Sequence, residues 1–195
     1  MSRAPKILAF SGSARTGSFN KLLVQVAAVG ARDAGAEVTY VDLRDLPMPL
    51  YDGDLEECDG MPANAQTFRE LMIEHDGFLI SSPENNRSIS SLLKNTIDWA
   101  SRKFRDLPGN AAYKGKVAAI MSASPGGLGG LRGLYHLRDI LVSMGTMVLP
   151  DQRAVSGAMK AFNSDGDIED EKMREGIRAI GAKLADTIRK LNDLG

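Results

Sequence analysis

The residues best suited to binding chemistry lie between positions 12 and 20, where a short apolar segment gives way to glycines and hydroxyl groups. Ser13, Thr16 and Ser18 can donate hydroxyl hydrogen bonds, and Arg15 can add a charge-assisted one. The segment leads from an expected strand into an expected helix, whose free N–H groups favour an anion. The pattern indicates a phosphate-binding loop. The alternative is that Ser18 only caps the helix and the glycines only turn the chain.

This loop differs from two common nucleotide-binding motifs. It nearly matches the P-loop pattern G-x-x-x-x-G-K-[ST], but Ser18 stands where the lysine must reach the outer phosphates. It also lacks the spaced glycines of G-x-G-x-x-G, which bring a dinucleotide pyrophosphate close to a helix. A nucleoside triphosphatase and a Rossmann dehydrogenase are therefore disfavoured, and a monophosphate suits the loop better.

Two further polar loops follow later apolar segments. Residues 83–88 begin with a proline and include Asn85 and Asn86, whose amides offer donors and acceptors in a turn of fixed shape. Residues 122–130 contain four glycines within five positions, so a flat ring can lie against the backbone. A plain surface turn and a flexible connector are the respective alternatives.

The three loops each follow one unit of a repeating strand–helix pattern. Continuous apolar segments are typical of buried parallel strands, which we expect at 6–11, 37–41, 77–82, 116–121 and 146–149. Apolar residues at spacings of three and four predict helices at 19–30, 63–75, 89–100, 134–144 and 173–191. We expect residues 46–62 to form a loop.

This alternation predicts a single α/β domain over residues 1–195, built on a doubly wound, five-stranded parallel sheet with helices on both faces. The flavodoxin-like strand order 2-1-3-4-5 suits five strands with right-handed crossovers. Ligands of such sheets bind at the carboxyl ends of the strands. The polar loops should therefore meet in one cleft.

Composition excludes several other classes of protein. The 24 Lys and Arg residues nearly balance the 25 Asp and Glu residues, which leaves no electrostatic footprint for nucleic acid or an anionic membrane. No apolar run approaches the ~18 residues of a membrane span. The only cysteine, Cys58, lies among carboxylates, and His75 and His136 have no partners at metal-ligand spacing, so we expect no disulfide and no metal site. A soluble, cytoplasmic protein is expected.

Three motifs occur together in one order along the chain. They are Gly12-Ser13-x-Arg15-x-x-Ser18-x-Asn20, Pro83-Glu84-x-Asn86 and Leu93-Lys94-Asn95-x-x-Asp98-Trp99. Through them the chain resembles the NADPH-dependent FMN reductase family over about Lys6 to Phe162. It is most similar to the chromate and quinone reductase branch, through Gly129-Gly130 and Tyr135-His136-Leu137-Arg138.

The resemblance implies a flavin site and its occupants. Residues implied to hold the FMN phosphate are Ser13, Arg15, Ser18, Phe19 and Asn20; those implied to line the isoalloxazine are Pro83, Glu84, Asn85, Asn86, Ser124, Gly126 and Gly127. Electrons would pass from NADPH or NADH through FMN to quinones or similar small acceptors, such as free flavin, chromate, azo or nitro compounds. No separate catalytic residue is expected, because the flavin carries the redox chemistry.

Three points follow from the same resemblance. The family usually has tyrosine where this chain has Asn85, so an aromatic surface is missing at the acceptor side. The segment Tyr135–Arg138 implies a homodimer or homotetramer, whereas without the resemblance it reads equally well as a solvated helix face.

A flavodoxin-like electron carrier without substrate turnover is the alternative function; the near-neutral charge and Arg15 count against it.

Overall fold

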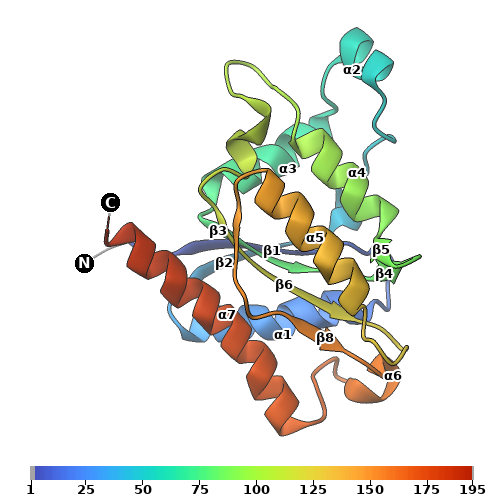
Figure 1. The fold of residues 1–195 in the computed structure, drawn as a ribbon, viewed down its shortest axis with the longest axis vertical. Coiled ribbons are helices and arrows are strands. Elements are labelled where there is room, and N and C mark those ends of the chain that lie inside the picture. The colour runs from blue at the N-terminus through green and yellow to red at the C-terminus, as the bar shows by residue number, and fades with distance from the viewer. Residues whose placement is uncertain (1–2, 195) are drawn as a thin grey trace.

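The continuous apolar segments form the strands of one parallel sheet in the computed structural model, which describes residues 3–194 (Figure 1). In the order in which they lie, the first four strands are β2 (Glu37–Val41), β1 (Lys6–Ser11), β3 (Gly77–Ser81) and β6 (Val117–Ala123). β1, β3 and β6 are buried along almost their whole length, because helices cover both of their faces. The predicted flavodoxin-like α/β fold is confirmed.

The fifth strand position is divided between two short strands, so the expectation of five continuous strands is wrong in this detail. β7 (Met147–Val148) pairs with the start of β6, and β8 (Arg153–Val155) pairs with its end. Between them lies Pro150, which has no N–H to donate to a ladder. The sheet therefore has six strands, in the order β2-β1-β3-β6 followed by β7, with β8 also paired to β6.

Two helices cover one face of the sheet and three cover the other (Figure 1). The first pair is α1 (Phe19–Asp33) and α7 (Glu171–Asn192). The second group is α3 (Ala63–Glu74), α4 (Ser91–Ala100) and α5 (Leu131–Ser143). Each layer encloses its own apolar core, as the expected helices on both faces require.

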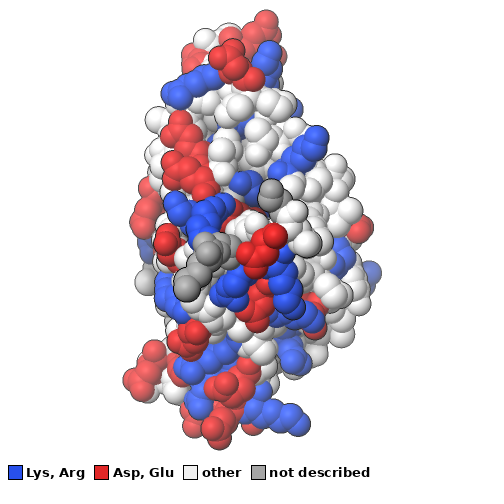
Figure 2. All heavy atoms as spheres, turned by 90° about the vertical axis from the view of Figure 1, so that its left-hand side faces the viewer, with Lys and Arg blue, Asp and Glu red and all other residues white. Residues whose placement is uncertain are grey.

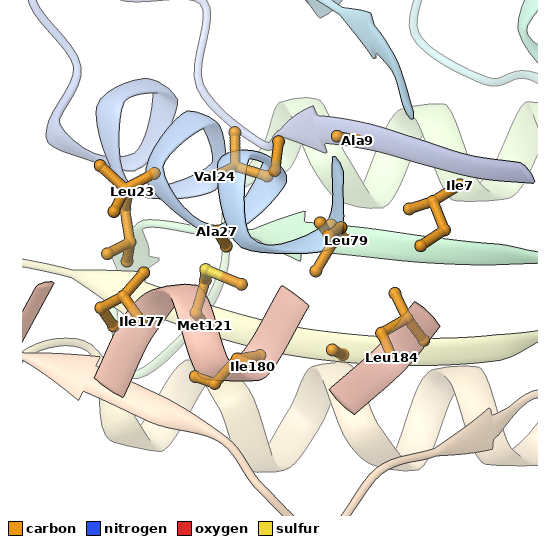
Figure 3. Packing of buried hydrophobic residues seen from close by; sticks show 14 of the residues in the cluster. Ile7, Ala9, Leu23, Val24, Ala27, Leu79, Met121, Ile177, Ile180 and Leu184 are labelled. Atoms are coloured by element: carbon orange, nitrogen blue, oxygen red, sulfur yellow. The ribbon is translucent and has the colours of Figure 1, made fainter. Parts of the chain in front are cut away.

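The core between α1, α7 and the sheet is dense because two glycines let the helices touch. A Cβ at Gly30 would lie 2.0 Å from the carbonyl oxygen of Arg178, and one at Gly181 would lie 1.9 Å from that of Ala27. In the same core, Leu23 of α1 and Ile177 of α7 lie close to Met121 of β6 (Figure 3). Any side chain at either glycine would force α1 and α7 apart.

Several short elements were not expected from the sequence. α2 (Gly53–Asp59) lies in the segment predicted as a loop, and the Asp52 carboxylate caps it by accepting from the Asp54 N–H at 2.8 Å. A hairpin of β4 (Glu84–Asn85) and β5 (Ser88–Ile89) occupies the second polar loop. The remaining short helices are η1 (Leu43–Asp45), η2 (Gly109–Ala112) and α6 (Ala158–Ala161).

Acidic and basic side chains are interspersed on the face shown in Figure 2, and neither sign gathers into one large patch there. This distribution fits the near balance of 24 basic and 25 acidic residues. Of the helices within residues 3–194, none has both the length and the apolar character that a membrane crossing requires.

Candidate functional site

A cleft of about 380 Å³ opens where β1, β3 and β6 end. Its volume lies in the range of roughly 300–1,000 Å³ that is typical of small-molecule sites. Nine of the expected site residues line it, namely Ser13, Arg15, Ser18, Phe19, Asn20, Pro83, Glu84, Asn85 and Ser124. Asn86, Gly126 and Gly127 do not line it. The three polar loops therefore meet as the sheet topology predicts.

The N-terminus of α1 forms one end of the cleft, and its polar groups are not satisfied by a side-chain cap. The Ser18 carbonyl accepts the first helical bond from the Lys21 N–H at 3.0 Å, but the Ser18 hydroxyl makes no capping bond. Among the residues described, the Arg15 guanidinium has no hydrogen-bond or ion-pair partner, although the Arg15 N–H lies 3.4 Å from the Ser13 hydroxyl. Free N–H groups, a hydroxyl and a cation together suit an anion.

Asn20 lines the cleft, but the protein itself engages its amide. Its Oδ1 accepts from the Ser81 hydroxyl at 2.8 Å and from the Ala123 N–H at 2.9 Å, while its Nδ2 donates to the Ala123 carbonyl at 2.9 Å. The side chain is 3% exposed. Asn20 thus joins α1 to the carboxyl ends of β3 and β6 and fixes the floor of the cleft.

Glu84 forms part of the wall, and its carboxylate also caps α5. It accepts from the backbone N–H groups of Arg132 at 3.0 Å and Gly133 at 3.3 Å, and it is paired with the Arg132 guanidinium. Burial alone would raise the pKa of Glu84, but the hydrogen bonds from Arg132 and Gly133 outweigh it and lower the pKa. The carboxylate stays ionised and anchors the β4–β5 hairpin to α5.

The hairpin turns through Asn86 and Arg87, which both have positive φ, 49° and 68°. Two such residues make the tight turn that matches the twist of a hairpin. Asn tolerates this conformation well, whereas an arginine there is strained by on the order of 1 kcal/mol. The amide of Asn86 was expected at the ring; this residue instead forms the turn, and only its neighbour Asn85 reaches the cleft.

Two of the four glycines in the third loop, Gly129 and Gly130, are required by packing. A Cβ at Gly129 would lie 2.7 Å from the backbone of Val155, and one at Gly130 would lie 1.9 Å from the Ser122 hydroxyl. The cleft receives only the start of this loop, Ala123 to Pro125. A flat ring could lie against that part, but the glycines themselves stand outside the lining.

The N-terminus of α4 also forms part of the cleft wall, which was not predicted from the sequence. Ser90 caps α4 by accepting from the Leu93 N–H at 3.1 Å, and its hydroxyl donates to the Gly12 carbonyl at 2.5 Å. Ser91 and Leu92 also line the cleft without having been assigned to it, whereas Gly12, Ala14, Ala123 and Pro125 belong to loop segments that were expected there. A serine three residues before Leu93 at the start of an apolar helix is a capping signal that could have indicated Ser90.

The turn after β2 supports the first loop from outside the cleft. The Arg44 guanidinium donates to the Thr16 hydroxyl, and the Asp42 carboxylate accepts from the Arg44 N–H at 3.0 Å. Asp42 also pairs with Lys21 of α1 at 2.6 Å. Thr16 therefore holds the loop in place and does not line the cleft.

Comparison with known proteins decides the family. The family model for NADPH-dependent FMN reductases matches residues 5–160 of the chain. The chain belongs to this family. An NAD(P)H-dependent FMN reductase from Pseudomonas aeruginosa is 37% identical over 192 residues, which cover 98% of this chain and 99% of that protein.

Two further proteins extend the comparison. An NAD(P)H:quinone oxidoreductase from Solanum tuberosum is 38% identical over 180 residues, covering 90% of this chain and 88% of that protein. The structure of FerB, a flavoenzyme NAD(P)H:(acceptor) oxidoreductase from Paracoccus denitrificans, superposes with a TM-score of 0.80 at 28% identity, covering 95% and 98% of the two chains. The expected FMN- and nicotinamide-dependent oxidoreductase is thus confirmed.

The third family motif, which contains Asn95 and Trp99, connects two segments of the chain and does not line the cleft. Asn95 accepts from the Tyr51 N–H at 2.7 Å and donates to the Pro49 carbonyl, to which Trp99 Nε1 also donates at 2.9 Å. The Trp99 ring is fully buried, so the expectation that it packs is confirmed. The motif ties the segment after β2 to α4.

The cleft has the chemistry that a flavin mononucleotide requires. The uncapped α1 N-terminus with Arg15 can take a phosphate dianion, and the backbone of Pro83–Asn85 faces the same space with Ser124. Within residues 3–194, no three His, Cys, Asp or Glu side chains are grouped to hold a metal ion. The family's cofactor fits the residues present.

Proposed function

We propose that this chain is an NAD(P)H:quinone oxidoreductase whose FMN binds in the cleft at the carboxyl ends of β1, β3 and β6. The phosphate would lie at the α1 N-terminus, held by Ser13, Arg15 and Ser18. The isoalloxazine would lie along Pro83–Asn85 and Ser124. Asn86, Gly126 and Gly127 would act on the shape of these walls and not through direct contact.

One observation carries this proposal. At a single edge of the sheet, an uncapped helix N-terminus and an unpaired Arg15 lie in the same cleft as a rigid backbone wall. Polar groups left unsatisfied by the protein fit a phosphate, and the wall fits the ring attached to it. The relatives named as FMN and quinone reductases support the same assignment.

Bound FMN would supply the redox chemistry, by accepting a hydride from NADPH or NADH and delivering electrons to the acceptor. The residues of this chain bind and orient. Arg15 neutralises phosphate charge, Asn20 keeps the strand ends in register below the cofactor, and ionised Glu84 holds the hairpin wall against α5. No residue of the cleft is assigned a proton transfer.

Donor and acceptor would use the same cleft in turn. The three polar loops converge on this cleft, and the first loop is suited to a monophosphate and not to a dinucleotide pyrophosphate. The donor must therefore leave before a quinone enters, which predicts ping-pong kinetics. Asn85 makes the mouth more polar than an aromatic residue would, so small planar acceptors should bind weakly.

The proposal extends to assembly and location. Tyr135 and Val142 on the outer side of α5 are 52% and 55% exposed, and two apolar side chains on one helix face suit a contact between copies of the chain. A homodimer or homotetramer is proposed on this basis, and so is a cytoplasmic location, where the exposed Cys58 thiol would stay reduced.

Cofactor analysis and rapid mixing test the function together. The purified protein should carry one FMN per chain, and its flavin absorbance should bleach rapidly on anaerobic mixing with NADPH and return on adding a quinone. Steady-state double-reciprocal lines should run parallel. Bound FAD, or a flavin that stays oxidised in NADPH until a separate reductase is added, would overturn the proposal in favour of another cofactor or of an electron carrier.

A further inference from the structure

Two arginines of this chain adopt the left-handed backbone conformation that favours glycine and asparagine. They are Arg87, with φ of 68°, and Arg105, with φ of 54°. An arginine with positive φ carries backbone strain, and glycine at either position would relieve that strain. Each arginine therefore needs a compensating interaction, and the two differ in where it is found.

Arg105 finds its compensation within the protein. Its guanidinium lies 3.7 Å from the Glu70 carboxylate and 4.8 Å from the centre of the Phe104 ring. Arg87 has no such neighbour: among residues 3–194 its guanidinium has no ion pair, no hydrogen bond and no aromatic ring beneath it. The Arg87 guanidinium is therefore left available to a group from outside the chain.

The hairpin that carries Arg87 is rigid, so this side chain starts from a fixed position. Glu84 on one strand is bound to the α5 N-terminus, and Ser88 on the other lies 3.0 Å from Nδ1 of His136. Ile89 is 7% exposed and packs into the core under α5. The tip therefore projects from a base that is fastened at three points.

The position of the tip relates it to the cleft. Asn85, which lines the cleft, pairs directly with Ser88, and the two-residue turn of Asn86 and Arg87 connects them. Arg87 thus lies two residues beyond Asn85, in the turn that borders the cleft, and is not itself a lining residue. The nearest carboxylate on its own hairpin, Glu84, is neutralised by Arg132.

The size of the cleft fixes which group can reach this arginine. A flavin would fill most of a space of about 380 Å³, so a nicotinamide ring must stack on the open side of the flavin and the rest of the dinucleotide must lie outside the cleft. The phosphates of the donor must then lie outside, along the mouth. A guanidinium is the side chain that binds phosphate oxygens in bidentate fashion.

We propose that Arg87 binds a phosphate of the nicotinamide donor at the mouth of the cleft and so sets the donor preference of the enzyme. The inference rests on the proposed function. The shared chemistry is a phosphate; the 2′-phosphate of NADPH and the pyrophosphate common to NADPH and NADH are its two sources.

Donor kinetics of Arg87→Asn test the proposal, because asparagine keeps the left-handed turn while removing the charge. We expect kcat/KM for NADPH to fall about tenfold, the size of one exposed charge-assisted contact, and Arg87→Lys to recover part of it. The change should appear in KM, with kcat and the FMN dissociation constant unaltered. Arg105→Asn is the matched control and should leave kcat/KM unchanged.

Three donors separate the outcomes. A loss with NADPH alone assigns the 2′-phosphate, and an equal loss with NADPH and NADH assigns the pyrophosphate; both support the proposal. Dihydronicotinamide riboside, which has no phosphate, should react equally with wild type and variant. An unchanged kcat/KM for both dinucleotides, or an equal loss with the riboside, overturns the proposal. A wild-type protein that no donor reduces would instead overturn the proposed function.

Discussion

The two ends of the sheet differ in how far their polar side chains are hydrogen-bonded within the protein. At the amino ends of the strands, Asp76 accepts from the Arg3 guanidinium and from the Lys6 N–H, and Lys116 donates to the carbonyls that end α3. At the carboxyl ends, the Ser18 hydroxyl makes no cap and Arg15 has no partner among the described residues. Both ends are polar, but Asp76 and Lys116 are engaged by the protein, whereas the Arg15 side chain and the Ser18 hydroxyl have no partner among the described residues.

This contrast separates structural polarity from binding polarity, and it also divides the family motifs. Asn20, Glu84 and Asn95 are motif residues whose polar atoms are engaged inside the protein. Arg15 and Ser18 are motif residues that line the cleft, and their side chains have no hydrogen-bond partner among the described residues, as the proposed phosphate site requires. Substitutions in the first group should change stability, and those in the second should change affinity.

Asn20→Ala should have the largest effect, on stability. Three hydrogen bonds would be lost, leaving the Ser81 hydroxyl and both backbone groups of Ala123 buried without partners. At roughly 1–3 kcal/mol for each unsatisfied group, and with partial relaxation, we expect a loss of about 3–5 kcal/mol. Urea unfolding of the cofactor-free protein measures it. A loss under about 1 kcal/mol, accompanied by weak FMN binding, would place Asn20 in the binding group instead.

Arg15→Ala should show the reverse pattern. Removing the unpaired cation should weaken FMN binding by about 1.5–3 kcal/mol, the scale of a hydrogen bond to a charged group, and leave the unfolding free energy of the cofactor-free protein unchanged. Fluorescence titration with FMN and with riboflavin measures the effect, and riboflavin, which has no phosphate, should bind equally to both proteins. If riboflavin binding fell as much as FMN binding, Arg15 would not be at the phosphate.

At the opposite end, Asp76 should make stability depend on acidity. Burial alone would raise its pKa, but the hydrogen bonds from Arg3 and Lys6 outweigh it and lower the pKa below the ordinary 3.8. A carboxylate with a lowered pKa contributes stability above its unfolded value, and that contribution is lost as pH falls through the folded value. Because Arg3 is exposed, we expect about 1 kcal/mol. The decline in unfolding free energy below pH 3.8 should be shallower in Asp76→Asn, and identical slopes would contradict the assignment.

The smallest effect is expected at the cleft wall. Asn85 lines the cleft where the family usually has tyrosine, so Asn85→Tyr should restore an aromatic surface and lower the KM for a quinone. One aromatic contact is worth roughly 0.5–1.5 kcal/mol, which is about a two- to tenfold change. Asn85→Leu is the control, because leucine at the same position adds apolar bulk without an aromatic ring. An unchanged KM in Asn85→Tyr would show that position 85 does not face the acceptor.

The sequence predicts most of the scaffold, because long elements carry strong periodic signals. The buried strands and the five long helices follow from continuous apolar runs and from spacings of three and four. The β4–β5 hairpin escapes this reasoning because strands of two residues have no period to detect. The division of the fifth strand cannot be predicted in this way either. β8 is a strand because it pairs with the end of β6, and its three residues carry no periodic signal of their own.

The sequence predicts where the candidate site lies but not what each of its residues contacts. The strand-to-loop positions bring Ser13, Pro83 and Ser124 to one edge, as the topology requires. That Asn20 is engaged by Ser81 and Ala123 cannot be seen from the sequence, because its partners are up to 103 positions away. Gly126 and Gly127 were expected at the ring but stand outside the lining of the cleft, and Gly129 and Gly130, which were not assigned to the ring, lie against β8 and Ser122.

The divided fifth strand also bears on how the molecule behaves among its own copies. A long, straight edge strand offers a row of free N–H and C=O groups, on which another chain can polymerise. Here the edge consists of two short strands, β7 with two residues and β8 with three, separated by a segment that contains Pro150. The Asp151–Lys183 ion pair lies in the same region. No stretch of this edge is long enough to template a sheet between molecules, so the interruption disfavours edge-to-edge pairing of copies at this side of the sheet.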